Sequence, residues 1–186
     1  LDLFFKNKPT GESAPPVRVQ IRPTVNGYPH SSAILPFAEV LMNAEDVNTT
    51  LALATDGSDA PNINNQATYT RFKFSSPVYL IPGEYSIVVM SNSNEYECYI
   101  AEMGETALGA GGARITQQPY AGVFFKSQNA STWSADQNAD LMFALNTCVF
   151  KTTTEPLQIV FNPVSGAEGF SVGESFQTDN AKIISQ

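Results

Sequence analysis

The segment VRVQIRPTVNGYP, residues 17–29, decides the fold class. Over residues 17–22, valine and isoleucine alternate with arginine and glutamine, the pattern of a β-strand with one apolar face and one solvated face. Pro23 lacks the backbone N–H that a sheet ladder needs, so we expect the strand to end there. The dipeptide Asn26-Gly27 favours the positive φ angles of a tight turn. The segment therefore predicts one strand followed by a loop over 23–33.

The rest of the chain has the composition of an all-β protein. Charged residues make up 15% of its 186 residues, where about 25% is usual, and Asn, Ser and Thr supply polarity instead. A net charge of −8 would repel a phosphate backbone, so we expect no nucleic-acid partner. Apolar runs are far shorter than the about 20 residues of a spanning helix, and no signal-peptide pattern is found. We therefore expect no membrane span.

Further short strands alternate with Pro, Gly and Asn clusters at the spacing of a β-sandwich. Residues 37–47 have a helical spacing of apolar side chains, but Pro36 and the flanking patterns favour a strand. Thr55–Thr68 and Gly104–Gly112 lack apolar periodicity and predict surface loops. These features predict an all-β fold, an antiparallel jelly-roll-like β-sandwich with long surface loops. The further strands expected are Leu1–Lys6, Tyr69–Phe74, Val78–Ile81, Tyr85–Met90, Tyr96–Ala101, Val123–Lys126, Ala139–Phe150 and Leu157–Phe161.

The composition changes near residue 152, where a polar stretch is followed by residues rich in Gly and turn formers. We expect residues 1–151 to form the sandwich. About 35 residues cannot form a stable core alone, so residues 152–186 are expected to be a C-terminal β extension or the start of a further module. Because the chain begins without methionine, we expect it to be part of a longer protein.

No group of residues has the spacing of a catalytic or metal site. His30 follows a turn with nothing local to hold its ring, so we expect a solvated loop histidine and no general base. Asp56, Asp59 and Asn62 offer oxygen ligands for calcium, but they lack the spacing of a calcium loop. We predict no catalytic residue, no metal and no cofactor. A glycosidase stays open as the least favoured alternative, since 18 acidic residues allow many carboxylate pairs.

The two cysteines, Cys98 and Cys148, each lie within a predicted strand. Small free thiols in such positions are usually buried, so we expect two free core cysteines. A disulfide between neighbouring strands is the alternative, which spacing along the chain does not decide.

The single tryptophan, Trp133, precedes a predicted core face made of Leu141, Phe143, Leu145 and Val149. Trp side chains bury a large area, so we expect Trp133 to cap the end of that core, with its N–H bonded to a loop. The alternative is a platform that stacks on a sugar ring. In that interpretation Tyr120 and Tyr28 supply the other stacking faces.

Four stretches together resemble a known family: VRVQIRPTVNGYP (17–29), SSPVYLIPGEYSIVVMSNSNEYECYIAEMGE (75–105), QPYAGVFFKSQNASTW (118–133) and ADLMFAL (139–145). The chain resembles a jelly-roll-like β-sandwich domain of virion structural proteins of contractile-tailed phages, of the type found in phages of marine cyanobacteria. The loop at 55–68 is longer than in that pattern, and the chain enters the sandwich after the family's first strand.

The resemblance implies a non-enzymatic structural module of a phage tail, baseplate or tail-fibre protein. Its partners would be other virion proteins and further copies of itself, and it would reside in the virion after assembly in the host cytoplasm. The loops at 23–33, 55–68 and 104–119 are the expected contact surfaces, because loops are least committed to the core. The alternative is a carbohydrate-binding module that recognises a host-surface glycan.

Overall fold

The structure, a computed structural model, describes residues 1–50, 61–108, 112–117 and 122–150. Contacts along the chain divide it into Leu1–Thr147 and Cys148–Gln186. All the strands described below belong to the first unit. The predicted boundary near residue 152 stays a prediction, and the strand expected at Leu157–Phe161 lies outside the described residues.

The described residues form short antiparallel β-strands, joined by turns and by two 3-10 helices, η1 (Ala44–Asp46) and η3 (Gln66–Thr68). The predicted all-β class is confirmed, and several antiparallel sheets are consistent with a β-sandwich. The jelly-roll order of strands stays a prediction. No helix among the described residues is long and apolar enough to cross a membrane. The strands are β1 (Asp2–Leu3), β2 (Phe5–Asn7), β3 (Val17–Val25), β4 (Tyr28–Pro29), β5 (Glu39–Met42), β6 (Thr70–Arg71), β7 (Tyr85–Ser91), β8 (Glu97–Cys98), β9 (Ile100–Glu102), β10 (Phe124–Lys126), β11 (Ser134–Asp136), β12 (Ala139–Leu141) and β13 (Phe143–Ala144).

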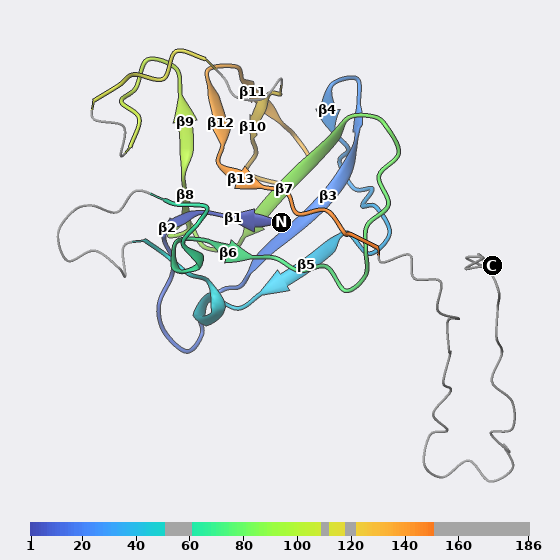
Figure 1. The fold of residues 1–186 in the computed structure, drawn as a ribbon. Helices are drawn as coiled ribbons and strands as arrows, with labels where there is room; N and C mark the ends of the chain where they lie inside the picture. Colours follow the sequence, from blue (N-terminus) through green and yellow to red (C-terminus); the bar gives the residue numbers. More distant parts are fainter. Residues whose placement is uncertain (51–60, 109–111, 118–121, 151–186) are drawn as a thin grey trace, which may run out of the picture. The chain divides into compact units, whose positions relative to one another are not determined.

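The largest sheet is built around β3, which pairs with β5 and β4 on one side and with β7 on the other (Figure 1). The β3–β7 ladder is the longest in the fold and runs from Val17 opposite Ser91 to Pro23 opposite Tyr85. The remaining strands form a three-stranded sheet, β13-β1-β6, and the pairs β2-β8, β9-β12 and β10-β11.

The hydrophobic core joins the N-terminal strands to the apolar residues of β3. It excludes solvent almost completely, and partly buried side chains from β5, β7, β8, β12 and β13 pack against it. The core residues are Leu1, Leu3, Phe5, Val17, Val19, Val47 and Phe72. The alternating valines that predicted β3 are therefore core residues, as expected.

The prediction that Pro23 ends the strand is wrong, because β3 continues to Val25. The Pro23 carbonyl accepts a hydrogen bond from the His30 N–H, but Pro23 has no N–H to return. Arg22 supplies the missing donor, since its Nη1 donates to the His30 carbonyl at 3.1 Å. The chain then turns at Asn26 and Gly27, whose φ angles are 52° and 79°, as the predicted tight turn requires.

The predicted solvated face of β3 is also wrong beyond Arg18. Gln20 is 3% exposed and Arg22 is 5% exposed. Arg22 remains satisfied because its Nε donates to Gln20, and its Nη1 donates to the carbonyls of Ser31 and Ala130 as well as His30. Burial lowers the pKa of this guanidinium. β3 is thus buried on both faces. The face opposite the hydrophobic core holds the hydrogen-bonded guanidinium of Arg22.

Other predicted strands are shorter or interrupted. Leu1–Lys6 is divided between β1 and β2, and Tyr96–Ala101 between β8 and β9. The segment at 37–47 holds strand β5, as favoured, followed by η1. Val78–Ile81 forms no strand, and Ala139–Phe150 holds only β12 and β13. Leu145 and Val149 are exposed, so the predicted core face ends at Phe143.

Candidate functional site

A hollow beside β7 has a volume of about 1530 Å³. Every residue from Gly83 to Ser93 lines one wall, and every residue from Gly122 to Ala130 lines the other. We call this hollow the β7–β10 groove. Half-buried apolar side chains from the margin of the core also line it: Ile87, Val89, Tyr96, Cys98, Leu141 and Phe143.

Trp133 lines the β7–β10 groove and is half-buried. Its Nε1 is shielded from solvent and has no hydrogen-bond partner in the described part of the chain. The predicted hydrogen bond from the indole to a loop is therefore not found there. An indole N–H donates only, so a buried one without an acceptor carries a cost of about 1–3 kcal/mol.

Asp140 on β12 lines the same groove. Its Oδ2 is likewise shielded and has no partner among the described residues. Burial raises the pKa of this carboxyl, because desolvation disfavours the charged form. The groove therefore holds an unpaired donor on Trp133 and an unpaired carboxyl oxygen on Asp140.

The cations that line the groove already have partners. Arg18 binds Glu39 with 2.6 Å between Nη1 and Oε1. Lys126 binds Asp136 across the β10–β11 pair, with 2.8 Å between Nζ and Oδ2. These contacts leave no free cation near Asp140 among the residues that line the groove.

The structure does not show Tyr28 or Tyr120, the other two predicted stacking residues, beside Trp133. Tyr28 is exposed on β4, and its ring centroid lies 5.4 Å from that of Phe125, which lines the groove. Tyr120 lies outside the described residues. The proposed three-residue stacking surface therefore stays a prediction.

An exposed apolar run, Tyr79-Leu80-Ile81, lies outside the groove. Tyr79 is 85% exposed and Ile81 is 58% exposed, and Leu80 is also exposed. The sequence pattern predicts a strand at Val78–Ile81, and the structure has none there. Pro77 and Pro82 flank the run, and their missing N–H groups were a signal against that strand.

Phe37 is also exposed, and its backbone conformation is unusual. Its side chain is 64% exposed, and its φ angle is 61°. A bulky L-residue with positive φ is strained, and such strain concentrates at functional positions. The turn is held by the hydrogen bond from the Ala38 N–H to the Leu35 carbonyl at 3.0 Å.

His30 is held more firmly than expected. Its Nδ1 accepts hydrogen bonds from the backbone N–H groups of Ser32 and Ala33 at 3.2 and 2.9 Å. The prediction that nothing local holds the ring is therefore wrong. With Nδ1 engaged as an acceptor of the turn, the histidine stabilises the segment after β4.

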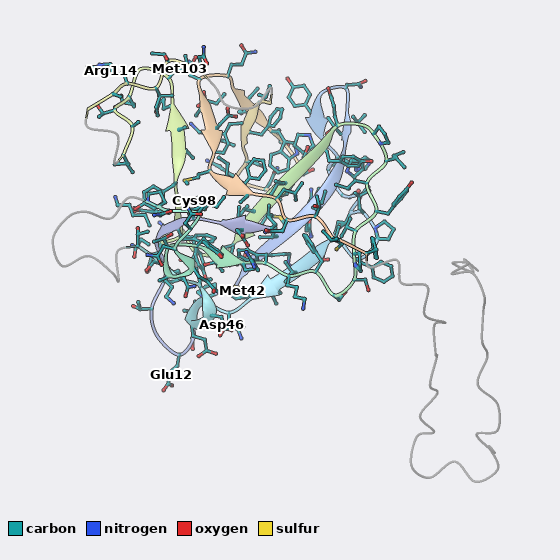
Figure 2. All side chains as sticks on the ribbon, in the orientation of Figure 1. Glu12, Met42, Asp46, Cys98, Met103 and Arg114 are labelled. Atoms are coloured by element: carbon teal, nitrogen blue, oxygen red, sulfur yellow. The ribbon has the colours of Figure 1, made fainter. Side chains whose placement is uncertain are left out.

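Both cysteines are free, as predicted, but one of them is not a core residue. Cys98 on β8 is half-buried, and desolvation raises the pKa of its thiol to about 12 (Figure 2). Cys148 is exposed and lies in no strand, which corrects its predicted core position. The strand ends with β13 at Ala144, although the apolar alternation in the sequence continues to Leu145.

The predicted contact loops are partly described. The segment at 23–33 forms the end of β3, the turn and β4. After β9, backbone hydrogen bonds from Gly104 to Ile115 and from Ala107 to Ala113 fold the next loop back on itself; Met103 and Arg114 are labelled in Figure 2. Asp56 and Asp59 lie outside the described residues, so the calcium site considered for them stays untested.

Comparisons with known proteins identify no relative. No family model matches the chain, and no curated protein or solved structure matches it.

Proposed function

We propose that the chain is a non-enzymatic structural module of a virion, in a tail, baseplate or tail fibre, where it joins other virion proteins. The virion setting rests on the resemblance of the four sequence stretches. The mode of action is supported by one observation, the exposed run Tyr79-Leu80-Ile81.

Three consecutive exposed apolar side chains are unusual on a protein that works alone in water. Burial of one large apolar side chain contributes about 1.5–3 kcal/mol, so a partner that covers all three gains several kcal/mol. Tyr adds a hydroxyl at the rim, and Tyr is enriched among the residues that dominate interface energies. The run therefore suits protein–protein contact better than catalysis.

The direct test is a density map of the particle that contains this protein. We expect the chain in the tail or baseplate, with Tyr79 and Ile81 covered by a neighbouring subunit. The exposed polar residues Asn62, Asn64 and Asn65 serve as an internal control, since they should stay solvated. The proposal fails if the chain is absent from the particle, or if the run faces solvent in every copy.

Glycan binding is a second candidate, favoured by the unpaired polar atoms in the β7–β10 groove. Sugar hydroxyls both donate and accept, so they could pair with Trp133 Nε1 and with Asp140 Oδ2. Binding of the full chain to a glycan array tests this candidate. Trp133→Phe keeps an aromatic face and removes the N–H, so this variant should lose part of the affinity for a glycan. Trp133→Ala removes both the ring and the N–H, so it should lose most of that affinity.

A further inference from the structure

β7 has one unpaired edge in the described fold. Ile21 on β3 bonds through both its N–H and its carbonyl to the segment 35–38, on the β5 side. Backbone groups in an antiparallel ladder alternate between the two sides of a strand. The residues of β7 opposite Arg18, Gln20 and Arg22 therefore bond to β3: Met90, Val88 and Ser86.

The intervening residues of β7 direct their backbone groups outward. Ile87 and Val89 lie opposite Ile21 and Val19, so their N–H and carbonyl groups point away from β3. No described strand pairs with that side of β7. An unpaired strand edge of this length is a template for another strand.

β10 lines the same groove and also has one edge without a described partner. It pairs with β11, and no other described strand pairs with it. Side chains alternate between the faces of a strand, yet consecutive residues of both β7 and β10 line the groove. The groove therefore follows the edge of each of these two strands.

We propose that the β7–β10 groove accepts one extended segment of a partner protein, which adds a strand between β7 and β10 and places a Lys or Arg beside Asp140. This inference goes beyond the proposed function, because Tyr79–Ile81 lies outside the groove. Its failure would leave the proposal for the exposed run intact.

The size of the groove fits a single strand. A strand in a packed sheet takes about 4.8 Å by 10 Å by 3.3 Å per residue, or roughly 160 Å³. A volume of about 1530 Å³ therefore has room for on the order of nine extended residues. β7 offers seven residues for pairing.

The lining sets the chemistry of the inserted segment. Apolar residues at alternate positions would pack on Leu141, Phe143 and Tyr96 at the margin of the core. Asp140 has an unpaired carboxyl oxygen, while Arg18 and Lys126 are already engaged by Glu39 and Asp136. The charge left unmatched in the groove is therefore negative, and a cationic residue on the partner complements it.

The test uses the full chain and a library of nine-residue peptides in which apolar and Thr residues alternate around a central Lys, Gln or Glu. Binding is followed by amide chemical shifts and amide hydrogen exchange. We expect library members to bind and to protect the Ile87 and Val89 amides. Lys peptides should bind about tenfold more tightly than their Gln counterparts, and Asp140→Asn should remove that preference.

Two variants at one position separate backbone pairing from side-chain contact. Val89→Pro removes an outward N–H without removing a bond to β3, a substitution that edge strands tolerate. It should weaken peptide binding at least about tenfold. Val89→Ala truncates the side chain and keeps the N–H, so it should stay within about threefold of the parent. Melting temperatures of both variants confirm that the fold persists.

Three results would each overturn the inference. One is the absence of binding across the whole library at about 1 mM peptide. Another is binding that shifts amides elsewhere and is unchanged in Val89→Pro. The third is a groove that binds oligosaccharides on an array while no peptide binds, which would assign it to glycans.

Discussion

At the residue scale, Arg22 and Pro23 show how neighbouring side chains decide the length of the longest strand. Pro23 removes one donor from the β3–β4 hairpin, and the guanidinium of Arg22 replaces it at the His30 carbonyl. The sequence pattern contains both residues, but the replacement depends on the path of the chain at 30–31. A prediction from proline alone therefore ends the strand at Arg22, three residues before its observed end at Val25.

Phe37 offers a prediction at this scale, because its positive φ costs about 1–2 kcal/mol for an L-residue. Phe37→Gly should raise the free energy of unfolding by up to about 1 kcal/mol, since glycine adopts this conformation freely. Phe37→Ala is the matched control, because it removes the same exposed ring and keeps the strain. Urea unfolding measures both, and a Gly variant no more stable than the Ala variant would contradict the account.

Asp2 and Arg71 predict a pH dependence. Desolvation opposes ionisation of Asp2, but two hydrogen bonds from Arg71 and one from Asn146 outweigh it and lower the pKa of the carboxyl. The pair therefore stabilises the fold above the ordinary Asp pKa of about 3.9, and this contribution is lost as pH falls through the lower folded value.

The free energy of unfolding of Asp2→Asn should accordingly lie about 1–3 kcal/mol below that of the parent at pH 7. The difference should disappear progressively below about pH 4. Glu39→Gln is the control, since its partner Arg18 is exposed and such pairs contribute about 0–1 kcal/mol. A constant difference between pH 7 and pH 2 would be evidence against the pair.

The cysteines give a third prediction. Cys98 is half-buried with a thiol pKa of about 12, so little thiolate exists near pH 8, whereas Cys148 is exposed. One thiol per chain should react rapidly with a chromogenic disulfide reagent in the folded protein, and two should react in denaturant. Cys148→Ser should abolish the rapid phase. Rapid reaction that survives in this variant would place Cys98 at the surface.

At the element scale, the strands with the strongest alternation were predictable and the weakly patterned ones were not. β3 alternates apolar and polar residues and β7 holds the continuous apolar run Ile87–Met90, and the sequence predicts both strands. β11 reads Ser-Ala-Asp and has no apolar pattern, so its strand depends on pairing with β10. The β7–β10 groove is lined by segments far apart in the sequence, so the local pattern of apolar and polar residues does not predict it.

The run Tyr79-Leu80-Ile81 carries the prediction at this scale. Replacing all three residues by Ser should change the free energy of unfolding by less than about 1 kcal/mol, because all three are exposed in the free chain. The same variant should fail to enter assembled particles. A matched triple substitution to Ser at Asn62, Asn64 and Asn65 should still assemble. Normal assembly of the apolar-run variant would remove this surface from the account.

At the scale of the whole molecule, the described unit combines a closed core on one side of β3 with an open margin along β7. Leu3, Phe5 and Val19 are fully buried, whereas Leu141 and Phe143 remain half-buried beside the groove. The predicted all-β sandwich class is consistent with the closed core. The open margin is where the fold leaves strand edges for a partner.

Amide hydrogen exchange along β7 in the full, free chain tests this claim most directly. The account predicts that the amides of Ser86, Val88 and Met90, which bond to β3, exchange at least about a hundredfold more slowly than those of Ile87 and Val89. Uniformly slow exchange of all five amides would show that both edges of β7 are paired, and would contradict the open edge.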